Sequence, residues 1–267
     1  MKIMILGGGN MGGAIVRGLI SGGSFPAKDI MVVDFSKERL NELKAFNDDV
    51  QLYTSIEESR ISDVDLFLLA VKPWQIQSVL SDLKFKLDYS RQAIVSIAAG
   101  VTFEQLNAYL KKDTTVDPII FRVIPNTAIA VRQSMTFISS CNANNEQESS
   151  IITLFNELGK AILIPENQMS AATALASCGI AYAMRYVRAA SEGGVELGFY
   201  PDIAKEIVLQ TVKGAVELLV ETGTHPEVEI DKVTTPGGIT IKGLNEMEQA
   251  GFTSAVIKGL KKSAAIN

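Results

Sequence analysis

The chain has 267 residues, a mass of 28.8 kDa and a formal net charge of −5, which is the size of one large domain or two modest ones. With 47% hydrophobic and 21% charged residues, it has the composition of a globular protein and is not disordered throughout. The acidic balance, without any Lys/Arg run, argues against a nucleic-acid partner. Cys141, Cys178 and the single histidine, His225, are too few for a disulfide framework or a zinc site, so no metal is predicted.

The first residues predict neither a signal peptide nor a membrane anchor. Only Ile3–Leu6 separates Lys2 from the first glycine, which is too short for a signal sequence. The longest uncharged stretch, residues 167–184, is rich in Ala, Ser, Thr and Gly and lacks the Leu/Ile/Val density of a spanning helix. We therefore expect a cytoplasmic protein with no membrane partner.

The first 165 residues alternate between short aliphatic runs and amphipathic segments. The runs predict strands at Lys2–Leu6, Ile30–Asp34, Leu66–Val71, Ala93–Ile97, Ile119–Val123, Met135–Ser139 and Ala161–Ile164. The amphipathic segments predict helices at Met11–Ser21, Lys37–Phe46, Trp74–Leu83, Thr102–Lys111 and Gln147–Leu158. Strand–helix alternation at this spacing predicts an α/β domain with a mainly parallel sheet.

After Pro165 the pattern becomes helical. We expect one long helix at Asn167–Leu197, a second at Pro201–Glu221 and a third at Ile239–Lys262. Pro201 suits a first helical turn, and Gly223 suits a helix stop. The sequence thus predicts an α/β domain over residues 1–165 and an all-helical domain over residues 166–267.

The helical domain is small for a core of its own. Its first helix is rich in small residues, which let helices approach closely: Ala171, Ala172, Ala174, Ala176, Gly179, Ala181, Ala183, Ala189 and Ala190. Two interpretations stay open, a tightly packed helix within one chain and a dimer in which the tails of two chains interlock.

A glycine-rich motif of the form G-x-G-x-x-G follows the first strand and opens a helix. In this context the glycines permit a tight turn, a close approach of the backbone to a pyrophosphate and close helix–strand packing. The phosphates would then face the free N–H groups of a helix N-terminus. The predicted dinucleotide contacts here are Leu6, Gly7, Gly8, Gly9, Asn10, Met11 and Gly12.

Asp34, at the end of the second predicted strand, lies 22 residues after Gly12. An acid at about this distance is the expected partner of the adenosine ribose 2′-hydroxyl, which favours NAD. Ser36, Lys37 and Arg39 follow at once and could hold a 2′-phosphate, which favours NADP, or form a solvated helix start. The choice between NADP and NAD therefore stays open.

Further cofactor contacts are expected where other strands end, because ligands of open parallel sheets bind beyond the carboxyl ends of the strands. One set is Ala70, Val71, Lys72 and Pro73, where proline permits a helix to start. A second set is Ile97, Ala98 and Ala99, whose small residues leave room for a nicotinamide ring. A third contact is Asn126, in the segment Pro125-Asn126-Thr127, with Arg122 at the end of the preceding strand.

A second glycine-rich segment, Thr234–Thr240, lies between two predicted helices. Gly237 and Gly238 before a helix start expose backbone N–H groups that attract a carboxylate. Thr240 offers a hydroxyl to a substrate, or it caps the helix as a structural residue.

These motifs together resemble the pyrroline-5-carboxylate reductase family over almost the whole chain. The matching pieces are Gly7–Gly12, Ala70–Pro73, Ser96–Val101, Arg122 with Pro125–Thr127, Glu221–Gly223 leading into His225-Pro226, and Val233–Leu244 with Glu248. The resemblance implies a Rossmann domain followed by an all-α dimerisation domain, an NAD(P)H cofactor, a homodimer and often larger assemblies of dimers. The chain departs from the family pattern at two positions. Ile180 replaces a proline in Ala176–Tyr182, and Lys232 stands where many members have Asn or Met.

The resemblance implies 1-pyrroline-5-carboxylate, a cyclic imine with a carboxylate, as the substrate. A protonated imine accepts hydride without a dedicated acid, which agrees with the scarcity of catalytic residue types, so catalysis would be mainly positioning. Thr240 would hydrogen-bond the ring nitrogen. The implied substrate contacts are Ser177, Gly237, Gly238, Ile239 and Thr240.

Two other functions fit the sequence less well. A β-hydroxyacid dehydrogenase has a catalytic lysine early in its long helix, and no lysine occurs here between Lys160 and Lys205. A non-catalytic nucleotide-binding module would not need the Gly237–Thr240 segment. His225 and the two cysteines are expected to be structural residues.

Overall fold

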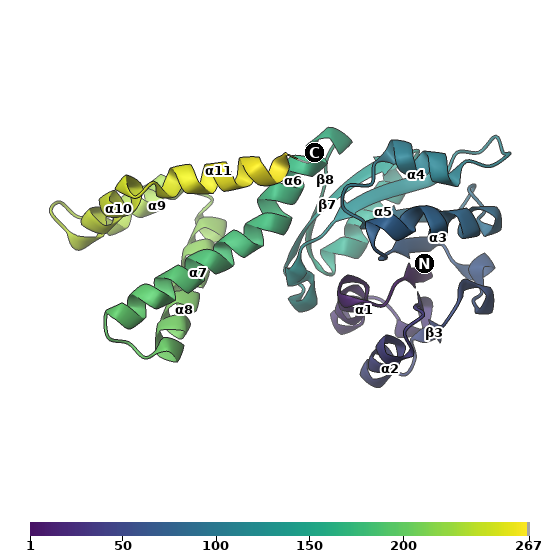
Figure 1. Cartoon of the computed structure of the whole chain (residues 1–267), viewed down its shortest axis with the longest axis horizontal. Coiled ribbons are helices and arrows are strands. Elements are labelled where there is room, and N and C mark those ends of the chain that lie inside the picture. The colour runs from purple at the N-terminus through teal and green to yellow at the C-terminus, as the bar shows by residue number, and fades with distance from the viewer. Residues whose placement is uncertain (266–267) are drawn as a thin grey trace. The chain divides into compact units, whose positions relative to one another are not determined.

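The computed structural model describes residues 1–265, apart from the side chain of Glu58, and contains one eight-stranded sheet (Figure 1). The order of the strands is β3-β2-β1-β4-β5-β6-β7-β8. Every neighbouring pair is parallel except β6–β7, which confirms the mainly parallel sheet. The strands are β1 Ile3–Leu6, β2 Ile30–Val33, β3 Gln51–Tyr53, β4 Leu66–Leu69, β5 Ala93–Ser96, β6 Ile119–Ile124, β7 Ser134–Cys141 and β8 Gly159–Leu163.

Five helices connect these strands, as the alternation predicts. They are α1 Asn10–Gly22, α2 Lys37–Phe46, α3 Ile76–Leu83, α4 Phe103–Leu110 and α5 Asn145–Asn156. α3 begins later than predicted because Pro73–Gln75 forms a 3₁₀ turn. The predictions missed β3, a three-residue edge strand that is only half-buried and therefore lacks a hydrophobic run.

The sheet is buried on both faces, which explains the continuous hydrophobic runs of its central strands. All four residues of β1 and of β4 are buried. One face packs against α1, α2 and α5, and the other against α3 and α4. The carboxyl ends of the strands are thus held rigidly between two helical layers.

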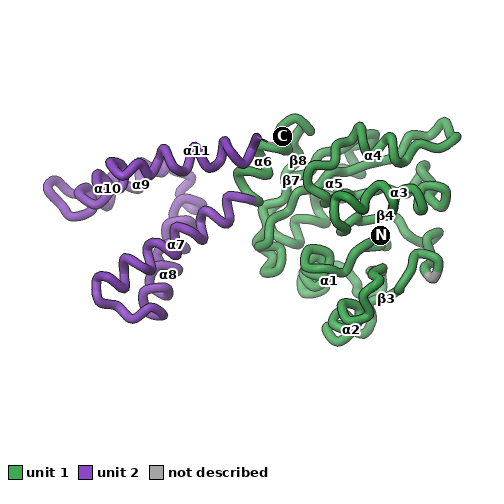
Figure 2. The backbone as a smooth tube through the Cα atoms, viewed as in Figure 1, with its two compact units in different colours: residues 1–177, 266 green, residues 178–265, 267 purple. Residues whose placement is uncertain are grey.

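The contacts divide the chain into two units, residues 1–177 and residues 178–265 (Figure 2). The predicted boundary after residue 165 stays a prediction, and Ile266 and Asn267 of the predicted helical domain lie outside the described residues. The helices after the sheet are α6 Met169–Ala172, a π-helical turn Thr173–Cys178, α7 Gly179–Glu196, α8 Pro201–Thr222, α9 Pro226–Val233, α10 Ile239–Gln249 and α11 Phe252–Ala264.

The segment predicted as one long helix over residues 167–197 is helical without a break from residue 166 to residue 196, but it is not a uniform α-helix. A 3₁₀ turn, α6, the π-helical turn and α7 share that segment. The Thr173 hydroxyl donates to the Met169 carbonyl at 2.7 Å, and such back-bonding bends helices.

The prediction of one helix over residues 239–262 is wrong. Gly251 adopts a left-handed conformation with φ +86° and separates α10 from α11. Thr240 is therefore the second residue of α10, the second-last helix of the described chain. The predictions missed α9 before it, which has His225 as its N-cap and Pro226 in its first turn.

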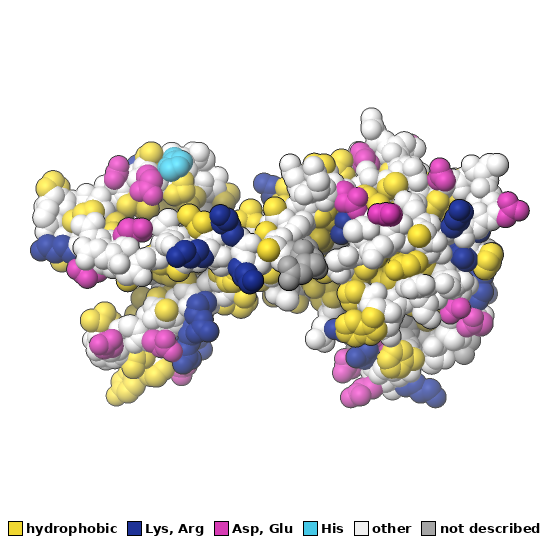
Figure 3. Space-filling view, turned by 45° about the horizontal axis from the view of Figure 1, so that its top comes forward, with side chains coloured by type: hydrophobic (Ala, Val, Ile, Leu, Met, Phe, Trp, Pro, Cys, Tyr) yellow, Lys and Arg dark blue, Asp and Glu magenta, His cyan; other side chains and the backbone are white. Residues whose placement is uncertain are grey.

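Pro201 in the first turn of α8 and Gly223 at its end are confirmed, the latter with φ +63°. The described part of the second unit has little core, since Ala204 is its one buried residue. Hydrophobic side chains lie on the surface of this unit among charged ones (Figure 3). Those at least half exposed include Met184, Leu197, Tyr200, Leu209, Val216, Leu218 and Val220.

Candidate functional site

Most of the predicted cofactor residues meet at one edge of the sheet. β2, β1, β4, β5 and β6 are adjacent and parallel, so their carboxyl ends lie side by side. The five predicted sets follow directly after these five ends. This edge is where open parallel sheets bind their ligands.

The glycine motif brings α1 very close to the end of β1. Gly7 has φ +107°, and a Cβ there would lie 2.7 Å from the Ala70 carbonyl oxygen. A Cβ at Gly12 would lie 2.0 Å from the Gly7 carbonyl oxygen. No L-residue with a side chain fits either position, so the fold itself requires both glycines.

Gly9 is different, because the protein leaves space beside it. A Cβ at this position would meet nothing closer than the Arg39 guanidinium, at 3.7 Å. Gly9 is also the N-cap of α1, and no side chain caps this helix. The open space and the uncapped N–H groups together form a cradle that fits a pyrophosphate.

Asp34 joins the second strand to this glycine loop. It lies one residue beyond β2, and it is 4% exposed. Its Oδ2 accepts the Gly8 N–H at 2.7 Å and its Oδ1 accepts the Ser36 N–H at 2.8 Å. The Arg39 guanidinium lies 3.5 Å from Oδ2. The buried carboxylate therefore holds the glycine loop and the start of α2 together.

Ser36 and Arg39 occupy the start of α2, and Lys37 is its first residue. The Ser36 Oγ accepts the Arg39 N–H at 3.4 Å, which caps the helix. Both basic side chains are exposed beside Asp34. The geometry thus combines an acid suited to a ribose with a basic helix start suited to a phosphate.

The loops after β4 and β5 stay hydrogen-bonded to the sheet. The Ala70 N–H donates to the Leu6 carbonyl at 2.8 Å, and the Ile97 N–H donates to the Leu69 carbonyl at 3.2 Å. The Ala98 N–H lies 3.4 Å from the Ser96 Oγ. After β4, the Lys72 N–H donates to the Gln75 side chain at 3.2 Å and starts the 3₁₀ turn.

The loop after β6 contains Asn126 and accepts a hydrogen bond from Ser177. The Asn126 Oδ1 accepts the Ala128 N–H at 3.0 Å, and its own N–H donates to the Ser134 Oγ at 3.1 Å. The Ser177 hydroxyl, in the π-helical turn, donates to the Pro125 carbonyl at 3.0 Å. Ser177 is therefore anchored to the loop that holds Asn126.

Arg122 was expected at the end of its strand, but it lies inside β6. Its buried guanidinium pairs with Glu166 at 2.6 Å. Glu166 also accepts the Phe103 N–H at 2.8 Å. Arg122 thus links three segments of the first unit, which a strand pattern alone does not reveal.

Gly237, Gly238, Ile239 and Thr240 belong to the second unit and surround the start of α10. Gly237 has φ +72°, and the Gly238 N–H donates to the Thr235 carbonyl at 2.9 Å. Gly238 is the N-cap, with no side chain closing the helix. Thr240 is exposed in the first turn, so it does not act as the N-cap of this helix.

Other classes of site lack support in the described residues. Across residues 1–265 no group of three or more His, Cys, Asp or Glu side chains could hold a metal ion. Within the same range, none of the helices combines the length and the apolar character that crossing a membrane requires.

Two different family models match the two parts of the chain. Residues 166–267 match the family model for pyrroline-5-carboxylate reductase dimerisation, and residues 2–100 match the model for NADP oxidoreductase, coenzyme F420-dependent. Pyrroline-5-carboxylate reductase 2 of Dictyostelium discoideum is 37% identical over 98% of this chain and 91% of its own length. Reductase 1 of the same organism is also 37% identical over 98% of this chain, which spans only 48% of that protein. The crystal structure of a Plasmodium falciparum pyrroline carboxylate reductase with NADP bound has a TM-score of 0.86 at 27% identity and covers 99% of this chain and 95% of that one.

The difference between the glycines generates a prediction. Gly9→Val should fold, because the protein leaves room for its side chain, but it should lose dinucleotide binding by filling the cradle. Calorimetric titration with NADPH and NADH measures the binding, and circular dichroism measures the fold. Gly12→Val is the matched comparison and should disturb folding as well, because its Cβ would overlap the Gly7 carbonyl. Unchanged affinity in folded Gly9→Val would refute the cradle.

Proposed function

Since the chain belongs to the pyrroline-5-carboxylate reductase family, we propose that it reduces the cyclic imine 1-pyrroline-5-carboxylate to L-proline with NAD(P)H, the last step of proline biosynthesis. The observation that carries the proposal is the open cradle at Gly9, at the edge where five parallel strands end. Membership of this family is compatible with either NADPH or NADH. It disfavours the two alternatives, a β-hydroxyacid dehydrogenase and a non-catalytic nucleotide-binding module.

The cofactor contacts are proposed on the first unit. The uncapped start of α1 would bind the pyrophosphate, and Asp34 with Ser36, Lys37 and Arg39 would bind the adenosine ribose or its phosphate. The loops that carry Lys72, Ala98 and Asn126 would hold the rest of the cofactor. When bound, NAD(P)H supplies the hydride that the imine carbon accepts. The protein's own task is then to orient the imine and exclude water.

The substrate contacts are proposed on the start of α10 and on Ser177. The free N–H groups beside Gly237, Gly238 and Ile239 suit the substrate carboxylate. The Thr240 hydroxyl is exposed and is not used as the N-cap, which supports a bond to the ring nitrogen. The Ser177 oxygen keeps acceptor capacity beyond the hydrogen that it donates to Pro125.

Thr240→Ala should therefore reduce catalysis without unfolding the protein. A hydrogen bond to a charged group contributes about 1.5–3 kcal/mol, so we expect kcat/KM to fall about 10- to 100-fold. Steady-state kinetics with 1-pyrroline-5-carboxylate measures this loss. NADPH affinity and thermal stability should hardly change, because no cap is removed.

Thr240→Ser is the matched control, because it restores the hydroxyl. It should recover most of the lost kcat/KM. A lower melting temperature in Thr240→Ala with nearly normal kcat/KM would assign the residue a structural role instead.

The preference between NADPH and NADH is proposed to depend on the start of α2. Changing Lys37 and Arg39 together to alanine should weaken NADPH binding about tenfold, because two cations next to the 2′-phosphate are lost, and should spare NADH. Asp34→Ala should weaken both cofactors, since the Gly8 N–H would lose its partner. Calorimetric titration of each variant with both cofactors measures these effects. A Lys37/Arg39 double variant with unchanged NADPH affinity would contradict the phosphate contact.

We also propose that the second unit forms a homodimer. α7 has no buried residue in the single chain, and many hydrophobic side chains of α7 and α8 are exposed. This exposure favours the dimer with interlocked tails over a helix packed tightly within one chain. Sedimentation equilibrium should show a dimer or larger assembly, and a stable monomer at micromolar concentration would contradict it. Larger assemblies and the cytoplasmic location stay predictions from the sequence.

A further inference from the structure

Two large aromatic side chains are exposed at the carboxyl edge of the sheet without a role so far. Phe35 is 79% exposed and Trp74 is 78% exposed. Tryptophan is highly buried on average in folded proteins. Exposing both rings to water beside the proposed cofactor contacts therefore suggests that a ligand covers them.

The sheet register places these two residues on opposite sides of the glycine loop. Phe35 comes two residues after β2 and Trp74 five residues after β4. Both strands pair with β1 in register, since Val33 and Leu69 are each opposite Leu6. Neighbouring strands lie about 4.8 Å apart, so the two strand ends are separated by about 10 Å across the end of β1.

This separation suits a flat ring held between two others. Optimal contacts between carbon atoms are about 3.5–4.0 Å, so a base stacked on both faces needs two rings roughly 7–8 Å apart. Two rings carried by loops at strand ends about 10 Å apart can meet that spacing.

We propose that Phe35 and Trp74 clamp the adenine ring of NAD(P)H, an inference that rests on the proposed function. Asp34, next to Phe35, is the proposed partner of the adenosine ribose, to which the adenine is attached. Aromatic side chains bind bases through their faces and need no specific hydrogen bonds. The clamp thus adds affinity for either cofactor without choosing between them.

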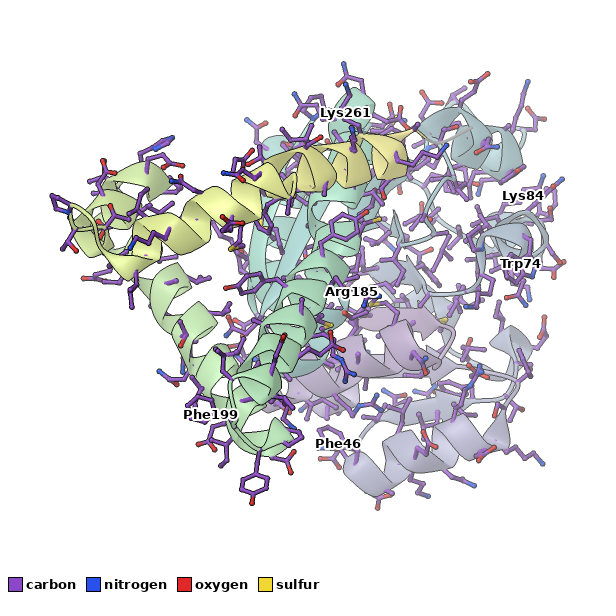
Figure 4. The ribbon with its side chains drawn as sticks, turned by 60° about the vertical axis from the view of Figure 1, so that its left-hand side comes forward. Phe46, Trp74, Lys84, Arg185, Phe199 and Lys261 are labelled. Atoms are coloured by element: carbon purple, nitrogen blue, oxygen red, sulfur yellow. The ribbon has the colours of Figure 1, made fainter. Side chains whose placement is uncertain are left out.

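Phe85 shows that exposure alone does not define the clamp, and it supplies a control. It is 74% exposed, but it lies in the turn Lys84–Lys86 after α3, with the Lys84 ammonium 5.0 Å from its ring centre. The eight residues of α3 separate this turn from the one that holds Trp74, a length of about 12 Å. Trp74 precedes α3 and Lys84 follows it along the chain, and both are labelled in Figure 4.

The first test uses Trp74 as its own reporter, because it is the one tryptophan of the chain. Adenosine 2′,5′-bisphosphate and ADP-ribose should change its fluorescence, since both carry adenine and neither carries nicotinamide. Nicotinamide mononucleotide should leave the fluorescence unchanged. A change with nicotinamide mononucleotide alone, or with none of the three probes, would overturn the clamp.

The second test compares three exposed positions by calorimetry with NADPH. Phe35→Ala and Trp74→Ala should each raise the Kd about tenfold, within the range for base–aromatic stacking, whereas Phe85→Ala should not change it. Trp74→Phe should restore most of the affinity. Phe85→Ala should also keep the wild-type kcat, because Phe85 lies outside the clamp. Equal affinities for all three alanine variants would refute the clamp.

These measurements also separate the clamp from the proposed reaction. A wild-type protein whose Trp74 responds to ADP-ribose, but which reduces no 1-pyrroline-5-carboxylate, would support the clamp and refute the reaction. A wild-type protein that reduces the imine, with Phe35→Ala and Trp74→Ala binding NADPH as tightly as Phe85→Ala, would support the reaction and refute the clamp.

Discussion

The close approach of α1 to the end of β1 is the constraint on which the candidate site depends. A Cβ at Gly12 would overlap the Gly7 carbonyl, and a Cβ at Gly7 would overlap the carbonyl of Ala70 in the next loop. The helix can therefore begin directly at the sheet edge only if both residues are glycine. That position leaves its uncapped N–H groups beside Gly9, where the nearest side chain is the Arg39 guanidinium.

Asp34 connects this constraint to the question of the cofactor. Sequence reasoning treats an acid at this position as a ribose partner and the basic residues after it as phosphate partners. In the structure the carboxylate already accepts two backbone N–H groups and lies beside Arg39. Its charge is thus partly offset before any cofactor binds, so an acid here does not by itself exclude a 2′-phosphate. The position of the acid along the chain cannot show this, because one of the two N–H donors, that of Gly8, is 26 residues away.

The parts of the fold that the sequence predicts are those with strong local patterns. The buried strands were found because both of their faces are apolar, and α2 was found to the residue because Ser36 caps it. β3 was missed because three half-buried residues carry no pattern. The π-helical turn was missed because its residues, Thr173–Cys178, read like the α-helix around them, and the bond between Ser177 and Pro125 joins segments 52 residues apart.

The candidate site shows the same division. The glycine loop and the strand ends were predictable, because the motif and the topology together place them at one edge. The ion pair of Arg122 was not, since its partner Glu166 is 44 residues further along the chain. Phe35 and Trp74 carry no motif at all, and only their exposure in the folded chain sets them apart from core aromatics.

The second unit follows a different physical rule from the first. Helical stability in proteins comes mostly from packing an apolar face, not from helix propensity. α7 and α8 together span 40 residues, yet the only buried residue in them is Ala204. Their hydrophobic side chains therefore gain little from folding within one chain, and a second copy is the surface that could cover them. If so, folding of this unit and association are one equilibrium, and its stability should depend on protein concentration, as it does for proteins without a stable folded monomer. The small residues along α7 then have a use that the single chain does not give them, because they allow a neighbouring helix to approach closely.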